Sequence, residues 1–349
     1  MKQIAILGYG IVGSGVDEVI REYAEKKRSG VTLSVKYILD IRDIPDSRVV
    51  SDFALIEEDP DVAVVVESIG GRGAAAEFTR RALSAGKHVV TSNKELVAEH
   101  GAELLALAKA NNAHYLFEAS VGGGIPIIHP FCQCLGANTV TDVIGILNGT
   151  SNYILTHMEQ NGASFEEALK EAQKLGYAEA DPSADVDGLD CARKICILAD
   201  LAYGRHIPPS NIYVEGIGSV TTAHLREANK AGFTIKLLGR AHQAEGELPR
   251  VYAAPHMVAK AHPLAAVSDV FNAVMLRGSV AGDVMFYGRG AGARPTASAV
   301  VSDILDCLRS DDPLCGFAWS ADPLDIAPPQ NAPGYIFADG KKMRVLKNN

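Results

Sequence analysis

The sequence lacks the features by which membrane-spanning and nucleic-acid-binding chains are recognised. No apolar run reaches the roughly 18 residues that a bilayer-spanning helix needs, so no membrane partner is expected. Acidic residues outnumber basic ones, 42 to 33, and no basic run is interleaved with aromatic residues, so no nucleic-acid partner is expected either. Met1 and Lys2 lead directly into an expected strand, so we expect no signal peptide.

Cysteine is also scarce, and its spacing argues against the common metal and redox motifs. None of the six cysteines forms a CxxC pair, and Cys132 and Cys134 lie two apart on an expected helix, where they point to different faces. We therefore expect reduced thiols in a cytoplasmic protein. No internal repeat or long polar tract is visible, and 349 residues with 47% hydrophobic content favour two or three domains.

The N-terminus carries a glycine pattern typical of dinucleotide binding. The apolar run that opens the chain leads into Gly8-Tyr-Gly-Ile-Val-Gly13, and a helix is expected from there to residue 27. In this pattern Gly8 permits the tight turn, Gly10 lets the backbone approach a pyrophosphate, and Gly13 lets helix and strand pack closely. The phosphates would then lie at the positive helix N-terminus, beside Ile11 and Val12.

Alternating strands and helices continue through the first 120 residues. This rhythm predicts an α/β fold with a Rossmann-type, doubly wound parallel sheet. We expect a nucleotide-binding domain at residues 1–130, completed by a helix at about 290–310 that follows a second glycine-rich segment, 288–296. The expected strands are 33–39, 62–67, 88–91 and 114–118, and the expected helices are 75–85 and 95–110.

Cofactor identity depends on two residues after the second expected strand. Asp40 ends that strand, where an acidic side chain would accept a hydrogen bond from a ribose 2′-hydroxyl and favour NAD. It lies farther past the glycines than the usual spacing of about 20 residues, because the first helix is long. Arg42 would instead attract the 2′-phosphate of NADP, so NAD and NADP both stay open, as does an ordinary strand-end role for Asp40.

Two loops at the carboxyl ends of later strands supply further candidates. Thr91, Ser92 and Lys94 lie at the edge where open α/β sheets bind ligands, so we expect them at the cofactor. Lys94 would orient a carbonyl or carry a proton, since the dipole mildly disfavours a lysine at a helix start. In Glu118-Ala-Ser-Val-Gly-Gly-Gly-Ile-Pro126, three glycines follow a carboxylate, which suits ligand-facing backbone groups, an oxygen-bound cation, or a hinge.

The sequence after the glycine loop has an α+β texture. Ser164-Phe-Glu-Glu167 is a capping box for a helix that ends near residue 175. Later strands follow one another without helices between them, which predicts a mostly antiparallel sheet whose outer face could pair two subunits. We expect a substrate-binding and dimerisation domain at 135–288 and an irregular, proline-rich tail at 311–349. The expected strands are 141–147, 234–241, 251–257, 273–277 and 283–287.

The segment from Gly176 to Lys194 places five carboxylates just ahead of two basic residues. Its first part has the composition of a loop, and its last part enters an apolar-periodic run at 186–203 that predicts a helix. Asp190 and Lys194 are four apart, so they share one helix face. Carboxylates with an ammonium at their edge suit a small zwitterionic substrate that exchanges a proton. The alternative is an N-capped surface helix beside solvated charges.

These motifs together resemble those of the homoserine dehydrogenase family. The resemblance implies a reversible, NAD(P)H-dependent reduction of aspartate 4-semialdehyde to homoserine, within threonine and methionine biosynthesis. It also implies a homodimer formed through the substrate domain and an amino-acid substrate. The matching segments lie in family order within residues 1 to about 310: 8–13, 90–94, 118–126, 145–153, 176–194 and 290–296.

The resemblance further implies roles for single residues. Lys194 matches the proton donor, Lys94 its partner at the reacting oxygen, and Asp190 the carboxylate that orients the substrate and Lys194. Glu179 matches the residue that binds the substrate's amino group, and Asp185 and Tyr177 are candidates for the same pocket.

Cofactor and cation contacts follow from the same resemblance. Gly176 and Gly292 match contacts to the nucleotide. Glu118 matches a ligand of a sodium ion, and Val121, Gly123 and Ile125 match its backbone-oxygen ligands.

Two features depart from the family pattern. The chain ends before the C-terminal ligand-binding domain of many members, so end-product feedback is not expected, and the run His129, Phe131, Cys132 and Cys134 is unusual. A dehydrogenase of another amino-acid semialdehyde or 2-amino acid stays an alternative. A second alternative is a protein that senses NAD(P) without turnover, although two lysines and Asp190 speak against it.

Overall fold

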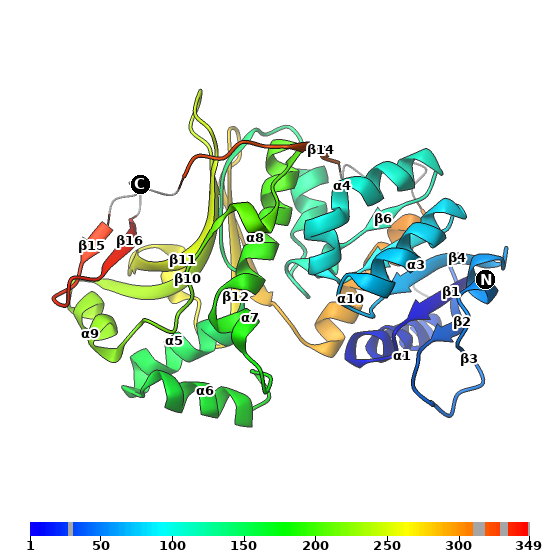
Figure 1. The fold of residues 1–349 in the computed structure, drawn as a ribbon, viewed down its shortest axis with the longest axis horizontal. Helices are drawn as coiled ribbons and strands as arrows, with labels where there is room; N and C mark the ends of the chain where they lie inside the picture. The colour runs from blue at the N-terminus through cyan, green and yellow to red at the C-terminus, as the bar shows by residue number, and fades with distance from the viewer. Residues whose placement is uncertain (27–30, 310–317, 329–333, 348–349) are drawn as a thin grey trace. The chain divides into compact units, whose positions relative to one another are not determined.

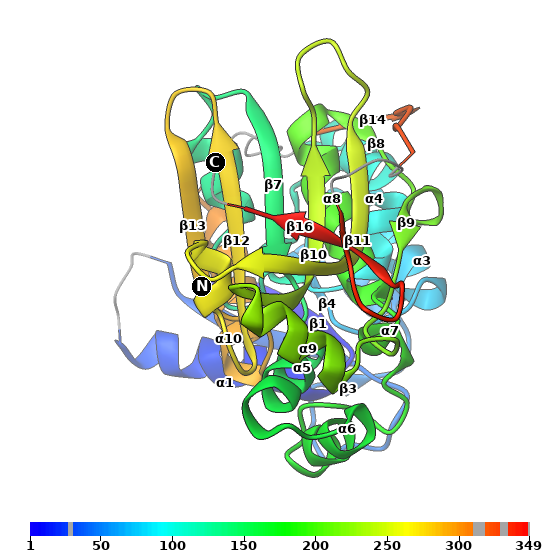
Figure 2. The same cartoon turned by 90° about the vertical axis from the view of Figure 1, so that its left-hand side faces the viewer.

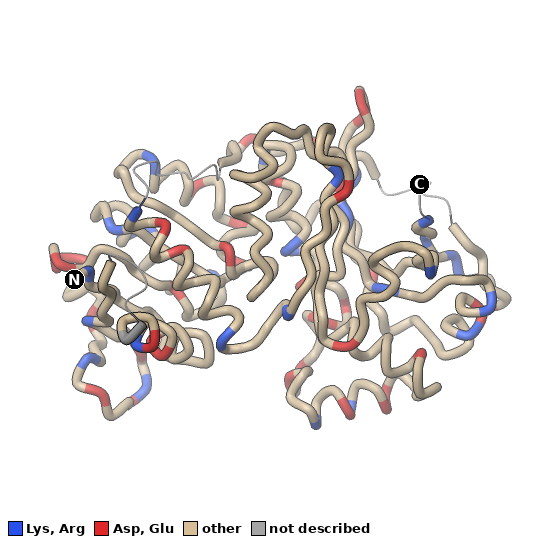
Figure 3. The backbone as a smooth tube through the Cα atoms, turned by 180° about the vertical axis from the view of Figure 1, so that it is seen from behind, with Lys and Arg blue, Asp and Glu red and all other residues tan. Residues whose placement is uncertain are grey.

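A computed structural model describes residues 1–26, 31–309, 318–328 and 334–347. The chain divides into two units, each built from discontinuous segments (Figure 1). Unit 1 comprises Met1–Gly136, Tyr203–His206 and Ala291–Asp322, and unit 2 comprises Ala137–Ala202, Ile207–Gly290 and Pro323–Asn349. Basic and acidic residues are interspersed over both units (Figure 3).

Unit 1 contains the expected parallel sheet. Six strands pair in the order β3-β2-β1-β4-β5-β6, and every pair is parallel. Consecutive residues of β1 and β4 are buried, so both faces of the sheet are covered, as near-continuous apolar strands require. The strand order reverses between β1 and β4, which places a topological switch point beside the glycine turn. The strands are β1 (Lys2–Leu7), β2 (Leu33–Leu39), β3 (Val49–Val50), β4 (Val62–Glu67), β5 (His88–Thr91) and β6 (Tyr115–Leu116).

Helices from both ends of the chain complete unit 1. The last of them packs beside the first, because Gly15 has no side chain and a Cβ there would lie 3.2 Å from the Ala293 carbonyl oxygen (Figure 1). The helices are α1 (Ile11–Lys26), α2 (Ala54–Glu57), α3 (Gly73–Ser84), α4 (Lys94–Ala110) and α10 (Ala293–Cys307), with short turns at Glu118–Ser120 and Pro130–Cys134.

Unit 2 is built on a mixed, mostly antiparallel sheet, as predicted. Its strands run in the order β13-β12-β7-β10-β11-β16-β15, and β9 also pairs with β11 (Figure 2). Only the pairings of β11 with β16 and β9 are parallel among the described strands of this sheet. The strands are β7 (Val140–Ile146), β9 (Tyr213–Val214), β10 (Phe233–His242), β11 (Arg250–Ala259), β12 (Phe271–Gly278), β13 (Gly282–Arg289), β15 (Gly334–Ile336) and β16 (Lys342–Leu346).

Helices pack on one face of this sheet. A Cβ at Gly239 of β10 would lie 2.9 Å from Ile195, so α8 approaches the sheet closely. The capping box at Ser164 and Glu167 is confirmed. The predicted helix at 186–203 is wrong at its start, because Gly188 has φ +83° and separates two helices. The helices are α5 (Gly149–Asn161), α6 (Phe165–Lys174), α7 (Ser183–Val186), α8 (Leu189–Tyr203) and α9 (Thr222–Lys230).

The C-terminal segment is more regular than the irregular tail expected at 311–349. Strand β14 (Ser320–Pro323) pairs with β8 (Arg205–His206), and β16 adds a parallel strand to β11. Met343 and Leu346 bury their side chains there. A five-residue strand is too short for periodicity to reveal, and its partner lies about 90 residues earlier. Among the described residues, no helix has the length and apolar character of a membrane span.

Candidate active site

The turn between β1 and α1 has the geometry that dinucleotide binding demands. Gly8 has φ +84°, and a Cβ there would lie 2.8 Å from the Ser68 carbonyl oxygen. A Cβ at Gly13 would lie 2.0 Å from the Gly8 carbonyl oxygen, so a side chain at either position would break the turn. The Cβ position of Gly10 meets open space, and Ile11 begins α1 directly afterwards. The turn therefore presents the start of α1, including Val12, to an anion.

Asp40 and Arg42, the two candidates for cofactor selection, bind one another. The Arg42 guanidinium donates to both Asp40 oxygens at 2.9 and 2.8 Å, and the Tyr9 backbone N–H donates to Asp40 Oδ2 at 2.7 Å. The guanidinium hydrogen bonds hold the pKa of Asp40 well below its usual range. Asp40 thus links the glycine turn, through Tyr9, to an exposed cation.

A second network fixes the same turn. The Tyr9 hydroxyl donates to Asp17 of α1 at 2.6 Å, and Arg48 binds both oxygens of Asp17 at 3.0 and 2.8 Å. Asp17 is fully buried, so these bonds replace its lost hydration. Sequence reasoning missed this network, because Arg48 lies 31 residues from Asp17.

Glu67, at the carboxyl end of β4, is a buried acid that sequence reasoning missed. Its Oε1 accepts from the backbone N–H groups of Ile69 and Gly70, and its Oε2 accepts from the Thr91 hydroxyl at 2.5 Å. Burial raises the pKa of Glu67. Thr91, predicted at the cofactor, is therefore linked through the Glu67 carboxylate to the loop that follows β4.

Helix α4 begins at Lys94, on the sheet edge formed by the carboxyl ends of β4 and β5. Asn93 caps that helix through Leu96 N–H and donates to the Gly71 carbonyl oxygen at 2.7 Å. Asn93 N–H in turn donates to the Thr91 hydroxyl oxygen. Ser92 and Lys94 are half-buried on this rigid turn, at the carboxyl ends of β4 and β5.

The glycine loop after β6 holds all four predicted cation ligands. The Glu118 carboxylate is buried and accepts from three backbone N–H groups, those of Ile127, Ile128 and His129, at 2.6–2.8 Å. It therefore caps the helical turn that follows the loop. Val121, Gly123 and Ile125 lie on the intervening tight turn, where Ile125 N–H donates to Gly122.

In unit 2, the paired lysine and aspartate of the acidic segment meet as their spacing predicts. Lys194 Nζ lies 2.8 Å from Asp190 Oδ2 and donates to the Leu147 carbonyl oxygen at 2.8 Å. Both side chains are buried. The α8 surface thus carries a fixed ammonium–carboxylate pair.

Asn148 joins this pair to a further carboxylate, and sequence reasoning missed it. Its amide nitrogen donates to Asp190 Oδ2 at 2.9 Å and to Asp185 Oδ1 at 2.7 Å. Its amide oxygen accepts from Ser151 N–H and caps α5. An asparagine before Gly-Thr-Ser predicts the cap, but not the contacts about 40 residues away.

The other candidates of this segment lie on the loop before α7. Thr150 donates to the Tyr177 carbonyl oxygen at 2.7 Å, and the Tyr177 ring lies edge-on to Tyr153. Gly176 turns with φ +76° after α6. Glu179 is exposed, in contrast to the half-buried Asp185.

These features define a class of protein. Unit 1 has a dinucleotide-binding turn at the switch point of a doubly wound sheet. Unit 2 has a buried lysine–carboxylate pair of the kind that exchanges protons with a substrate. The fold and site are those of a pyridine-nucleotide-dependent oxidoreductase.

Comparison with known proteins identifies the family. The family model for homoserine dehydrogenase matches residues 126–305, and the model for the homoserine dehydrogenase NAD-binding domain matches residues 8–118. The homoserine dehydrogenase of Synechocystis sp. is 45% identical over 316 residues, which cover 88% of this chain and 73% of that protein. That of Bacillus subtilis is 42% identical over 317 residues, with the same coverage of both chains. The chain belongs to the homoserine dehydrogenase family and is an NAD(P)-dependent oxidoreductase.

Solved structures agree with this assignment. The crystal structure of a homoserine dehydrogenase from Thiobacillus denitrificans has a TM-score of 0.88 at 39% identity and covers 94% of this chain and 79% of that one. A hyperthermophilic archaeal homoserine dehydrogenase in complex with NADPH has a TM-score of 0.75 at 30% identity, covering 88% and 98%.

Proposed function

We propose that this chain interconverts L-homoserine and L-aspartate 4-semialdehyde, with Lys194 as the group that exchanges a proton with the substrate oxygen. The main support for this proposal is the position of Lys194 Nζ, which is held by Asp190 and by the Leu147 carbonyl oxygen. An ammonium has three N–H donors. Two are directed to the protein, which leaves one for the reacting oxygen.

The roles of the surrounding residues follow from charge. A bound NAD(P) supplies or accepts the hydride. When the aldehyde is reduced, negative charge develops on its oxygen, and Lys194 stabilises that charge and donates its proton. Asp190 keeps the lysine ammonium in place, and Asn148 keeps Asp190 in place. For Lys94 we propose the role implied by the resemblance, that of a second cation at this oxygen.

We assign recognition of the substrate to the carboxylates of the acidic segment that do not pair with Lys194. The homoserine ammonium would bind Glu179, with Asp185 and Tyr177 lining the same pocket. Asp185 is half-buried and fixed by Asn148, so it is suited to orientation, whereas the exposed Glu179 is suited to first contact. The product would then enter threonine and methionine biosynthesis.

For the cofactor, we propose NAD as the preferred nucleotide. Asp40 Oδ2 lies beside the glycine turn, where it would accept from the ribose 2′-hydroxyl. Binding of NADP would require Arg42 to leave Asp40 and contact the 2′-phosphate. We assign further nucleotide contacts to Gly8, Gly10, Ile11, Val12, Gly13, Thr91, Ser92, Gly176 and Gly292.

A sodium ion is proposed at the glycine loop. The donor set of one carboxylate and three backbone carbonyl oxygens, from Val121, Gly123 and Ile125, suits a hard cation. Glu118 Oε1 already accepts two hydrogen bonds and Oε2 accepts one, so the residues fit a cation bound through Oε2 alone. The ion would stabilise the loop.

A homodimer is proposed through the sheet face of unit 2 that faces away from α8. That face carries the ion pairs Arg240–Asp142 and Arg277–Asp283. Met285 of β13 and its neighbour Tyr287 are exposed there. Apolar side chains among paired charges suit a self-complementary interface. Sedimentation of the purified chain tests this proposal, and a monomer at micromolar concentration would contradict it.

Initial rates with homoserine test the proposed reaction. We expect reduction of NAD, and more slowly of NADP, with homoserine as substrate. The Lys194→Ala variant should lose turnover while retaining cofactor binding. Absence of activity with either nucleotide, or normal turnover in the variant, would contradict the proposal.

A further inference from the structure

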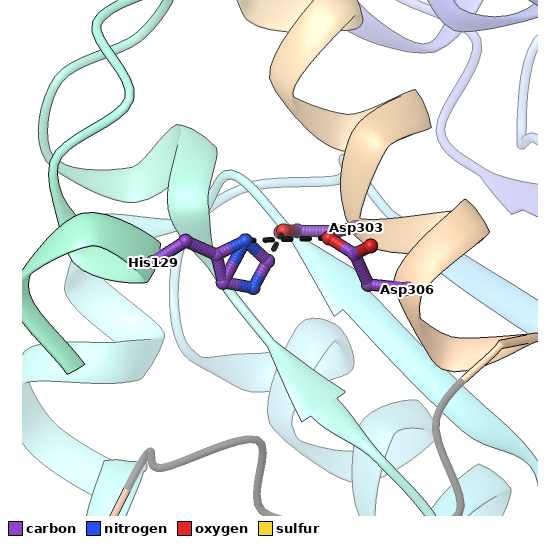
Figure 4. A group of neighbouring side chains, drawn as sticks. All are labelled: His129, Asp303 and Asp306. Carbon is purple, nitrogen blue, oxygen red and sulfur yellow. Dashed lines mark ion pairs between the residues drawn. The ribbon is translucent and has the colours of Figure 1, made fainter. Parts of the chain in front are cut away.

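A second group of potential ligands lies in unit 1, on segments that no proposed catalytic step uses. It consists of His129, Asp303 and Asp306, which we call the His129 cluster (Figure 4). His129 follows the glycine loop, and the two aspartates are three apart on α10, so they share a helix face. His129 Nδ1 lies 3.3 Å from Asp306 Oδ2, and Nε2 lies 3.8 Å from Asp303 Oδ1.

Asp303 has an oxygen that other described residues leave without a hydrogen bond. Its side chain is fully buried; Oδ2 accepts from Glu118 N–H at 2.9 Å, whereas Oδ1 makes no hydrogen bond and faces the His129 ring (Figure 4). A buried carboxylate oxygen of this kind normally has a cation or a donor beside it.

The cluster is accessible from solvent. A pocket of about 340 Å³ is lined by Glu118, His129 and Cys134 on one side and by Ser298 and Ser302 of α10 on the other. The side chain of Asp306 is 35% exposed and that of His129 is 16% exposed. An ion entering this pocket would therefore reach the His129 imidazole, whose Nε2 lies 3.8 Å from the buried Asp303 Oδ1.

We propose that His129, Asp303 and Asp306 bind one divalent transition-metal ion, with Zn²⁺ as the probe. One imidazole and two carboxylates form a ligand set that Zn²⁺ accepts, and water from the pocket would supply the fourth ligand. The three ligand atoms lie within 4.8 Å of one another. Ligands of a tetrahedral zinc ion are about 3.4 Å apart, so binding requires His129 and Asp306, both partly exposed, to rotate inward.

This site neighbours the proposed sodium site but differs from it in its ligands. It uses side chains of α10 and an imidazole, whereas sodium would use the Glu118 carboxylate and backbone oxygens of the glycine loop. The ion would join the segment after that loop to α10 and stabilise unit 1. It does not depend on the proposed reaction, so failure of either proposal leaves the other intact.

Metal titration of the untagged, reduced and chelator-treated chain tests the proposal. Calorimetry with Zn²⁺ should give one site per chain, and Co²⁺ should produce visible absorption bands that Zn²⁺ abolishes. His129→Ala and Asp306→Asn should each weaken binding at least tenfold, since loss even of outer-shell partners costs about 10–100-fold. Asp306 is partly exposed, so its variant keeps the test valid if His129→Ala fails to fold.

Two control variants separate this site from ordinary surface binding. His100 in α4 also lies beside a carboxylate, 3.4 Å from Glu103, so His100→Ala should bind zinc like the unaltered chain. Cys134 lines the same pocket, and Cys134→Ser should likewise retain binding. No saturable site in the unaltered chain, unchanged binding in both His129→Ala and Asp306→Asn, or loss of binding in Cys134→Ser would each overturn the proposal.

Discussion

Each unit holds a carboxylate–cation pair at a predicted site, and the two pairs have the same distance but differ in the exposure of the cation. Lys194 and Asp190 of unit 2 lie 2.8 Å apart, as do Arg42 and Asp40 of unit 1. The Lys194 side chain is 10% exposed, whereas that of Arg42 is 56% exposed. Desolvation makes a buried pair costly to break, whereas water screens an exposed one.

This difference agrees with the roles proposed for the two cations, a fixed proton donor for Lys194 and an exchangeable cofactor selector for Arg42. Lys194 is held from two sides and anchored through Asp190 to Asn148, so its ammonium has one position. Arg42 is held only by Asp40 among the described residues, so it can leave when a competing anion arrives. The same ionic bond thus suits proton exchange in one unit and nucleotide choice in the other.

Removal of the buried cation should have the largest effect. We expect Lys194→Ala to lower kcat by about 10²–10⁴-fold, the usual contribution of a positioned acid or base. Fluorescence titration should show that NADH binding is retained. Lys174→Ala, an exposed lysine of unit 2, is the control and should keep normal kcat. If kcat fell by less than about tenfold in Lys194→Ala, Lys194 would contribute no more than an exposed charge screened by water, and its role in proton transfer would be contradicted.

Loosening the buried pair should have the next largest effect. Asn148→Ala removes the side-chain amide that donates to both Asp185 and Asp190. Loss of a buried hydrogen-bond partner costs about 1–3 kcal/mol. We expect kcat to fall more than KM changes, since Asn148 acts through Asp190. Asn148→Ser restores the α5 cap but not both contacts, so its thermal stability should recover more than its kcat. If thermal stability and kcat recovered together in Asn148→Ser, the only role of Asn148 would be to cap α5.

What the sequence could reveal differs between these sites for a physical reason. Gly8, Gly13 and the Asp190–Lys194 spacing are local patterns, and the structure has the turn and the ion pair that they predict. Glu67 and Asn148 act through partners 24 and 42 residues away. Local periodicity determines which face a residue occupies, but the packing of distant segments determines its partner. The break at Gly188 was missed because apolar spacing alone does not report φ.

The substrate carboxylates provide a smaller test within unit 2. Glu179→Ala should raise the KM for homoserine by a few-fold to about tenfold with little change in kcat, because an exposed ion pair contributes little. Asp187→Asn, another exposed carboxylate of the segment, is the control. Steady-state kinetics at fixed NAD measure both. An equal rise in KM for both variants would indicate a general field of negative charge instead of a specific ammonium site.

Disruption of the exposed pair should have the smallest effect and should change preference, not catalysis. Arg42→Ala should lower kcat/KM for NADP a few-fold and leave that for NAD nearly unchanged, because only NADP would draw the guanidinium away from Asp40. Arg42→Lys should retain part of the NADP activity, since an ammonium still attracts a phosphate but lacks the planar two-point contact. Added salt should lower NADP activity in the unaltered chain more than in Arg42→Ala, because exposed charges are screened. Equal losses with NAD and NADP in Arg42→Ala would mean that Arg42 supports the Asp40 loop and selects nothing.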